Sequence, residues 1–113
     1  MRANHLLFEG RQIQLDKDGY LKNLGDWNSA VAQQLAAVEE VRLSPAHWEV
    51  IYLLRKFYEY HQVAPATRAL VNLVKRDLGR DKGRSIYLMR LFKSSPAKLA
   101  NKIAGLPKPV NCI

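Results

Sequence analysis

Hydrophobic and polar residues alternate along residues 6–15, LLFEGRQIQL, with the two-residue period of a half-buried strand. Ile13 and Leu15 fall on one face of such a strand, and the neighbouring glutamines fall on the other. Glu9-Gly10 interrupts the alternation with residues that suit a tight turn. The pattern predicts a β-hairpin of two short strands near the N-terminus.

From residue 30 onward the hydrophobic spacing changes to the 3.6-residue period of amphipathic helices. The stretch PAHWEVIYLLRKFYEYHQ is apolar over the widest arc and predicts the central helix, with His47 on the surface of its first turn. Ser44-Pro45 and Ser95-Pro96 each combine an N-cap residue with a proline at the first helical position, and Gly79 predicts a helix end. The predicted helices cover residues 30–41, 45–62, 65–78 and 83–93 and the stretch AKLANKIAG.

The last nine residues, GLPKPVNCI, differ from the segments before them. Gly105 is followed by two prolines, which exclude a helix and favour an extended path. We therefore predict a mainly α (α+β) fold, a small helical bundle of about five helices with an N-terminal β-hairpin and a flexible C-terminal arm. The helical domain is expected over residues 1–104 and the arm, which carries Cys112, over residues 105–113.

Length and composition limit the class of protein. A chain of 113 residues with 48% hydrophobic residues has room for one domain with a modest core. No segment approaches the run of about 20 apolar residues that spans a membrane, and the N-terminus lacks the apolar core of a signal peptide. One cysteine cannot form an intramolecular disulfide. We expect a cytoplasmic protein with no membrane partner.

Charge is uneven: residues 1–60 carry seven Lys/Arg and eight Asp/Glu, whereas residues 61–113 carry eleven Lys/Arg and two acids. This asymmetry favours an acidic partner, either nucleic acid or an acidic protein surface. One interpretation is a helix-turn-helix nucleic-acid binder, although such a pair is also the commonest way to pack two helices. The outward residues of its second helix would be Arg68, Asn72, Lys75 and Arg76.

Metal and cofactor chemistry have no recognisable pattern in the sequence. His5, His47 and His61 lack the spacing of metal ligands, so we expect no metal. GRDKG at 79–83 lacks the Walker spacing and does not follow a strand, so we expect neither a phosphate loop nor a cofactor. No serine or cysteine lies in a recognisable triad pattern.

The thiol of Cys112 is the strongest candidate for chemistry. A terminal segment without secondary structure is hard to bury, and the thiolate is the reactive form of a cysteine. The C-terminal carboxylate next door opposes ionisation, and Lys102 and Lys108 partly offset it. Nine residues from Gly105 to Ile113 reach roughly 30 Å when extended. These features predict a thiol that carries cargo on a swinging arm and is activated in the pocket of a partner.

Several stretches of the sequence closely resemble the DsrC/TusE family of sulfur-carrier proteins. They are FEGRQI and DGYL near the N-terminus, LSPAHWEVIYLLRKFY, PATRALV, YLMRLF, SPAKLANKIAGLPKP and above all the ending KIAGLPKPVNCI. The resemblance runs over nearly the whole chain. It implies a helical bundle with an N-terminal hairpin and a mobile C-terminal arm, on which Cys112 carries a sulfane sulfur as a persulfide.

Position 101 separates the two branches of the family. Proteins of the DsrC type work with dissimilatory sulfite reductase and carry a second arm cysteine eleven positions before the penultimate one, where this chain has Asn101. The resemblance therefore implies the TusE branch, a sulfurtransferase that relays sulfur for 2-thiouridine formation at the tRNA wobble position. A gamma-subunit-like partner of the sulfite reductase is the alternative within the family.

The same resemblance implies the partners. They are a TusBCD-like complex as the sulfur donor and a tRNA 2-thiouridylase with bound tRNA as the acceptor, and direct contact with the tRNA is left open. The arm residues expected to present the thiol and steer docking are Lys102, Gly105, Pro107, Lys108 and Pro109.

Overall fold

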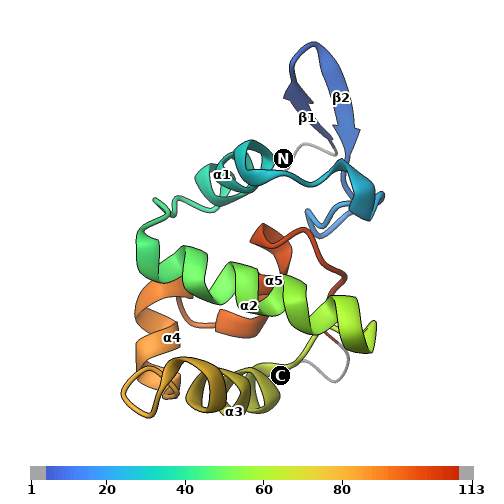
Figure 1. The fold of residues 1–113 in the computed structure, drawn as a ribbon. Helices are drawn as coiled ribbons and strands as arrows, with labels where there is room; N and C mark the ends of the chain where they lie inside the picture. The colour runs from blue at the N-terminus through green and yellow to red at the C-terminus, as the bar shows by residue number, and fades with distance from the viewer. Residues whose placement is uncertain (1–4, 110–113) are drawn as a thin grey trace.

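The structure, a computed structural model, describes residues 5–109 (Figure 1). Within this range lie two strands, one short 3-10 helix and five α-helices. In chain order they are β1 (His5–Phe8), β2 (Arg11–Gln14), η1 (Leu24–Asp26), α1 (Ser29–Val38), α2 (Pro45–His61), α3 (Thr67–Leu78), α4 (Ser85–Phe92) and α5 (Pro96–Ile103). The predicted class, a helical bundle with an N-terminal hairpin, is confirmed.

The hairpin forms as the alternation predicts. β1 and β2 pair antiparallel, and Glu9 and Gly10 join them with φ of 49° and 78°, the two positive values that a tight hairpin turn requires. Ile13 and Leu15 are buried against Leu35 of α1 and its neighbours in a small second core. The hairpin lies at one end of the molecule, beyond α1 (Figure 1).

Helix starts follow the capping signals with one exception. Asn28 Oδ1 accepts a hydrogen bond from the Val31 amide at 2.9 Å, and Ser44 caps α2 with a proline at its first position. The prediction that Pro65 opens a helix is wrong, because α3 begins at Thr67. Pro65 is buried in an extended segment instead, and its carbonyl accepts a hydrogen bond from α5.

The main core is built around α5. α2 crosses the middle of the molecule in Figure 1, as expected of the longest helix, yet α5 is the helix that packs against all four others. The prediction of a central α2 is therefore corrected. Ala97, Ala100 and Ala104 are fully buried, and their small side chains let the neighbouring helices approach the backbone of this segment. Within residues 5–109 no helix is long and apolar enough to cross a membrane.

His47 is the second correction to the expected surface. Its side chain is only 8% exposed, and its ring lies edge-on to Phe92. Nδ1 accepts a hydrogen bond from the Ser44 amide at 3.0 Å, so Nε2 carries the proton and donates to the Leu91 carbonyl at 2.8 Å. The imidazole is buried because it completes the cap of α2 and ties that helix to α4.

Candidate functional site

Cys112, the predicted reactive residue, lies outside the described residues. The structure does describe residues 105–109, which we call the arm base because they connect α5 to the segment that carries this cysteine. The division into a 1–104 domain and a 105–113 arm stays a prediction. The described part of the candidate site consists of α5, the arm base and the side chains that contact them.

A Schellman motif ends α5 and turns the chain into the arm base. The Leu106 amide donates to the Asn101 carbonyl at 2.9 Å, and the Gly105 amide donates to the Lys102 carbonyl at 3.1 Å. Gly105 adopts the left-handed conformation that this motif needs, with φ of 73°. The direction of the arm base is thus fixed by backbone hydrogen bonds and does not depend on its prolines alone.

Gly105 also lies directly against Trp27. A Cβ atom added at this glycine would stand 2.3 Å from Trp27 Cδ1 and 2.6 Å from Cγ. The indole is held in this position because its Nε1 donates to the Ile103 carbonyl at 2.9 Å. Two separate constraints, the backbone angle and the close approach of the indole, therefore require glycine here.

Arg55 of α2 also binds the C-terminal end of α5. Its guanidinium lies 3.9 Å from the centre of the Trp27 ring, and Nη1 donates to the Ala104 carbonyl at 2.6 Å. Burial of the guanidinium lowers the pKa of Arg55, and the nearby Glu59 carboxylate acts in the opposite direction. We call Trp27 and Arg55 the arm clamp, because together they bind the carbonyls of Ile103 and Ala104.

The arm base itself packs against the domain beyond Gly105. Leu106 and Pro109 are buried, Pro107 is half-buried, and Lys108 is exposed. Lys108 Nζ lies 3.5 Å from Asp18 Oδ2, in the turn that follows the hairpin. Apolar burial therefore continues beyond Gly105 as far as Pro109.

Lys102, the other lysine expected to steer docking, is held on the domain. Its Nζ lies 3.2 Å from Glu39 Oε2 and 5.2 Å from the centre of the Tyr20 ring. The Tyr20 hydroxyl in turn donates to the Lys98 carbonyl of α5 at 3.1 Å. Lys102 thus fixes α5 against the segment after α1, whereas Lys108 is the more exposed of the two cations.

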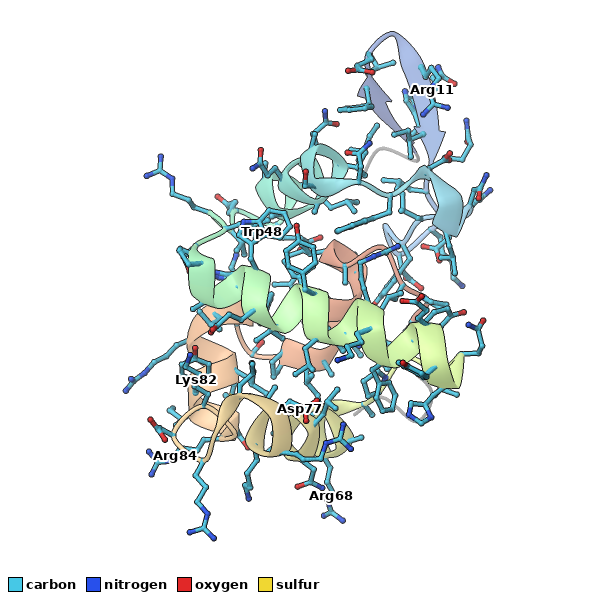
Figure 2. All side chains as sticks on the ribbon, viewed as in Figure 1. Arg11, Trp48, Arg68, Asp77, Lys82 and Arg84 are labelled. Carbon is cyan, nitrogen blue, oxygen red and sulfur yellow. The ribbon has the colours of Figure 1, made fainter. Side chains whose placement is uncertain are left out.

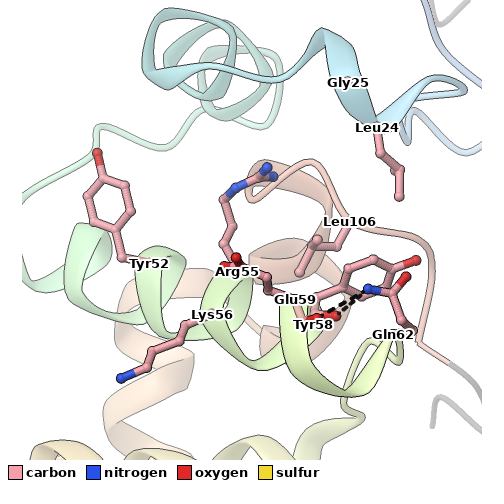
Figure 3. Close-up of a pocket in the computed structure, with 9 residues that line it drawn as sticks. All are labelled: Leu24, Gly25, Tyr52, Arg55, Lys56, Tyr58, Glu59, Gln62 and Leu106. Carbon is pink, nitrogen blue, oxygen red and sulfur yellow. Dashed lines mark hydrogen bonds between the residues drawn. The ribbon is translucent and has the colours of Figure 1, made fainter.

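A cleft of about 530 Å³ opens beside the arm base (Figure 3). It lies between η1 and α2, and Leu106 forms part of its wall. Its other lining residues are Leu24, Gly25, Tyr52, Arg55, Lys56, Tyr58, Glu59 and Gln62. The wall combines two tyrosines with both signs of charge, so this cleft places polar side chains next to the start of the arm.

Asn101 occupies the position that separates the two branches of the family. It is fully buried in α5, and its Nδ2 donates to the Pro65 carbonyl at 3.0 Å and to the Ala97 carbonyl at 2.8 Å. Two carbonyl acceptors fix the amide orientation, and Oδ1 then has no hydrogen-bond partner. Asn101 therefore ties α5 to the segment before α3.

The cations proposed for a nucleic-acid face lie on α3. Arg68, Lys75 and Arg76 are all exposed, and Figure 2 shows Arg68 pointing outward. Arg76 is paired with Asp77, with Nε to Oδ1 at 2.8 Å. This hydrogen bond raises the pKa of Arg76 and lowers that of Asp77. Among residues 5–109 no cluster of three His, Cys, Asp or Glu side chains could hold a metal ion.

The sequence carries no signal for the arm clamp. Trp27 lies outside the predicted elements, and Arg55 lies within an amphipathic helix, and neither carries a special signal in the sequence. Both act through backbone carbonyls more than 45 residues away, as the separations of 76 and 49 residues show. No local pattern reports such contacts.

Comparison with known proteins agrees with this architecture over nearly its whole length. The family described as "DsrC like protein" matches residues 7–113. Sulfurtransferase TusE of Photorhabdus laumondii is 53% identical over 108 residues, which are 96% of this chain and 97% of the relative. Sulfurtransferase TusE of Yersinia pestis is 52% identical over 108 residues, covering 96% of this chain and 99% of the relative.

Solved structures give the same fold. The NMR structure of Allochromatium vinosum DsrC matches with a TM-score of 0.89 and 44% identity, over 99% of this chain and 100% of that one. The oxidised gamma-subunit of the dissimilatory sulfite reductase (DsrC) from Archaeoglobus fulgidus matches with a TM-score of 0.84 and 36% identity, over 96% and 99%. On the sequence match, the fold and the relatives together, the protein belongs to the DsrC-like family.

Proposed function

We propose that this protein is a sulfurtransferase of the TusE type, a sulfur-relay component that carries sulfane sulfur on Cys112. The observation that carries the proposal is the match of about 50% identity over nearly the full chain to proteins named sulfurtransferase TusE. Carrying sulfur as a persulfide needs a thiolate, and Cys112 is the only cysteine in the chain. The relay is expected to deliver sulfur to a tRNA 2-thiouridylase for 2-thiouridine formation at the wobble position.

The chemistry is a pair of displacements at sulfur. In the first, the Cys112 thiolate attacks the outer sulfur of a donor persulfide, the donor's sulfur–sulfur bond breaks, and the donor cysteine leaves as a thiolate. In the second, a cysteine thiolate of the acceptor attacks the outer sulfur of the Cys112 persulfide. The sulfur–sulfur bond breaks, and Cys112 leaves as a thiolate. Each step conserves charge and needs no outside oxidant. A TusBCD-like donor, the thiouridylase acceptor and a cytoplasmic location complete the proposal.

Asn101 bears on the alternative role beside a sulfite reductase. An intramolecular disulfide needs a second thiol, and this chain has none. Position 101, where the other branch has its second cysteine, instead holds a buried amide bonded to two carbonyls. The side chain at this position supports α5 and cannot take part in a thiol cycle, which favours the relay.

Intact-protein mass spectrometry tests the proposal. Reduced protein is incubated with a cysteine desulfurase, cysteine and a donor complex, with Cys112→Ser in parallel and Ser94→Ala as the matched control at an exposed position. We expect one added sulfur atom on the wild type and on Ser94→Ala, removed by reductant, and none on Cys112→Ser. Sulfur retained by Cys112→Ser, or no sulfur on the wild type with a loaded donor, would refute the carrier role.

A further inference from the structure

A second hollow, which we call the α2–α3 groove, runs between α2 and α3. Its volume is about 270 Å³. Its rim and walls carry Lys56, Phe57, Tyr60, His61, Arg76 and Asp77, over a floor that includes the apolar side chains of Leu53 and Leu73. None of these side chains belongs to the arm clamp or the arm base, so the relay chemistry does not account for the groove.

Aromatic rings line the α2 side of this groove. The rings of Phe57 and His61 lie with their centres 4.4 Å apart and their planes inclined by 38°. Tyr60, one turn along from Lys56, is 77% exposed, the highest exposure among the large hydrophobic side chains in the described part of the chain. Tyrosine at such a position contributes little to the core. Its free ring face is instead a surface on which a flat ring can stack.

Cations outnumber carboxylates around the groove. Lys56 and Arg76 line it, and Arg68 and Lys75 are further exposed cations on α3. Within residues 5–109, Lys56, Arg68 and Lys75 make no ion pair. Asp77 is the one carboxylate in the lining, and it is paired with Arg76. The net positive field suits a polyanion.

We propose that the α2–α3 groove binds an unpaired segment of RNA, with a base stacked on Tyr60 and the backbone phosphates near Lys56 and the α3 cations. Stacking needs a base whose face is free, which a loop offers and a duplex does not. An acidic peptide would use the cations and leave the tyrosine without a role. The choice of RNA rests on the proposed function, because that function brings this chain to a tRNA held by the acceptor.

Fluorescence anisotropy with the full reduced chain tests the groove directly. The probes are a labelled RNA hairpin with an unpaired loop and the same stem as a blunt duplex. We expect the hairpin to bind at least about tenfold more tightly than the duplex. Tyr60→Ala should weaken hairpin binding about 5- to 150-fold, which corresponds to loss of one stacked base at about 1–3 kcal/mol. Lys56→Gln should weaken binding and reduce the slope of log Kd against log salt by about 0.7–0.9.

Asp77→Asn gives a change of opposite sign. It removes the carboxylate from the groove and frees the Arg76 guanidinium, so hairpin binding should become tighter. Arg11→Gln is the matched control for Lys56→Gln, because it removes one exposed cation from β2, at the far end of the molecule from α3 (Figure 2). Circular dichroism checks that each variant is folded. We expect folded variants, because Lys56 and Tyr60 are exposed.

Two sets of outcomes would overturn the proposal. In the first set, Arg11→Gln and Lys56→Gln weaken binding equally and Tyr60→Ala has no effect, or hairpin and duplex bind equally well. Either result would mean that RNA binds through non-specific electrostatic attraction and not in the groove. In the second set, RNA does not bind, whereas polyglutamate binds and Lys56→Gln weakens its binding. That result would indicate that the groove binds an acidic protein segment instead of RNA. The persulfide assay separates this failure from that of the relay: Tyr60→Ala should load sulfur like the wild type even if RNA does not bind, and anisotropy needs no sulfur.

Discussion

Replacement of Gly105 by alanine is the sharpest test of how the arm base is held. A left-handed φ of 73° costs a residue with a Cβ about 1–2 kcal/mol. The new methyl would also stand 2.3 Å from Trp27 Cδ1, whereas ordinary carbon contacts lie at about 3.5–4.0 Å. The indole cannot easily yield, because its Nε1 is bonded to the Ile103 carbonyl and Arg55 covers its face. Overpacking of this kind costs about 1–3 kcal/mol more.

Gly10→Ala supplies a matched control within the same chain. Gly10 has a similar φ of 78°, but a Cβ there meets nothing within 4 Å. The control should therefore lose only the backbone term of about 1–2 kcal/mol, while Gly105→Ala loses about 2–5 kcal/mol in total. The difference isolates the contact with Trp27. It corresponds to roughly a 5- to 150-fold change in the unfolding equilibrium constant.

Urea unfolding followed by far-UV circular dichroism measures both free energies, provided that the two variants share one m-value. Gly105→Ala should unfold at clearly lower urea than Gly10→Ala, and both should unfold below the wild type. If the two alanine variants are equally stable, the close approach of Trp27 to Gly105 is not a feature of the protein in solution. The account of the arm clamp would then fail with it.

Two further predictions concern buried polar side chains. His47→Ala should lower the free energy of unfolding by about 2–3 kcal/mol, because it removes the hydrogen bonds to the Ser44 amide and the Leu91 carbonyl. His61→Ala, at an exposed position, should change the free energy of unfolding by less than about 0.5 kcal/mol. Equal losses in the two variants would contradict the role of His47 in a buried cap. Asn101→Asp should cost about 3–5 kcal/mol at neutral pH, because a carboxylate would face the carbonyls of Pro65 and Ala97. Such a site raises the pKa of the new carboxyl in the folded state above its unfolded value of about 3.9. The loss in free energy of unfolding should therefore grow as pH rises from about 3.9 to the folded-state pKa, and it should shrink in acid. A loss independent of pH would contradict the geometry.

Local signals in the sequence predict the hairpin and the five α-helices but not every boundary. The hairpin, the cap at Ser44 and the end of α3 at Gly79 each depend on residues a few positions apart, and the structure confirms them. Pro65 misled because a proline suits a first helical turn and an extended segment equally well. Only the contact of its carbonyl with Asn101, 36 residues away, shows which one forms.

The candidate site was predictable only in part. Cys112 follows from its place in the tail and from the resemblance, and its role stays a prediction because it lies outside the described residues. Trp27 and Arg55 could not be found, since what distinguishes them is the backbone carbonyl that each one meets in the folded chain. His47 was misplaced for a similar reason: a polar residue in a first turn is usually exposed, and its partner lies on another helix.

Packing of the arm base limits the reach of Cys112 and therefore the place where the proposed sulfur transfer can occur. From Pro109, three residues bring the chain to Cys112, so the two Cα atoms lie within roughly 11 Å of each other, compared with roughly 25 Å from Gly105. In the proposed relay, a partner would therefore bring its own cysteine close to the surface around Pro109 while Leu106 and Pro109 stay buried.

Release of the arm base would extend that reach at a definite energetic cost. Exposing Leu106 costs about 1.5–3 kcal/mol, and parting Lys108 from Asp18 in an exposed ion pair adds about 1 kcal/mol at most. A micromolar complex is worth about 8 kcal/mol, so a partner that engages residues 106–109 can supply this energy from its own contacts. The arm clamp binds the carbonyls of Ile103 and Ala104, which precede Leu106, and need not open. The Leu106 amide gives up its bond to the Asn101 carbonyl, which adds about 0.5–1.5 kcal/mol. The hinge of a released arm is therefore expected at Gly105–Leu106, with α5 left intact below it.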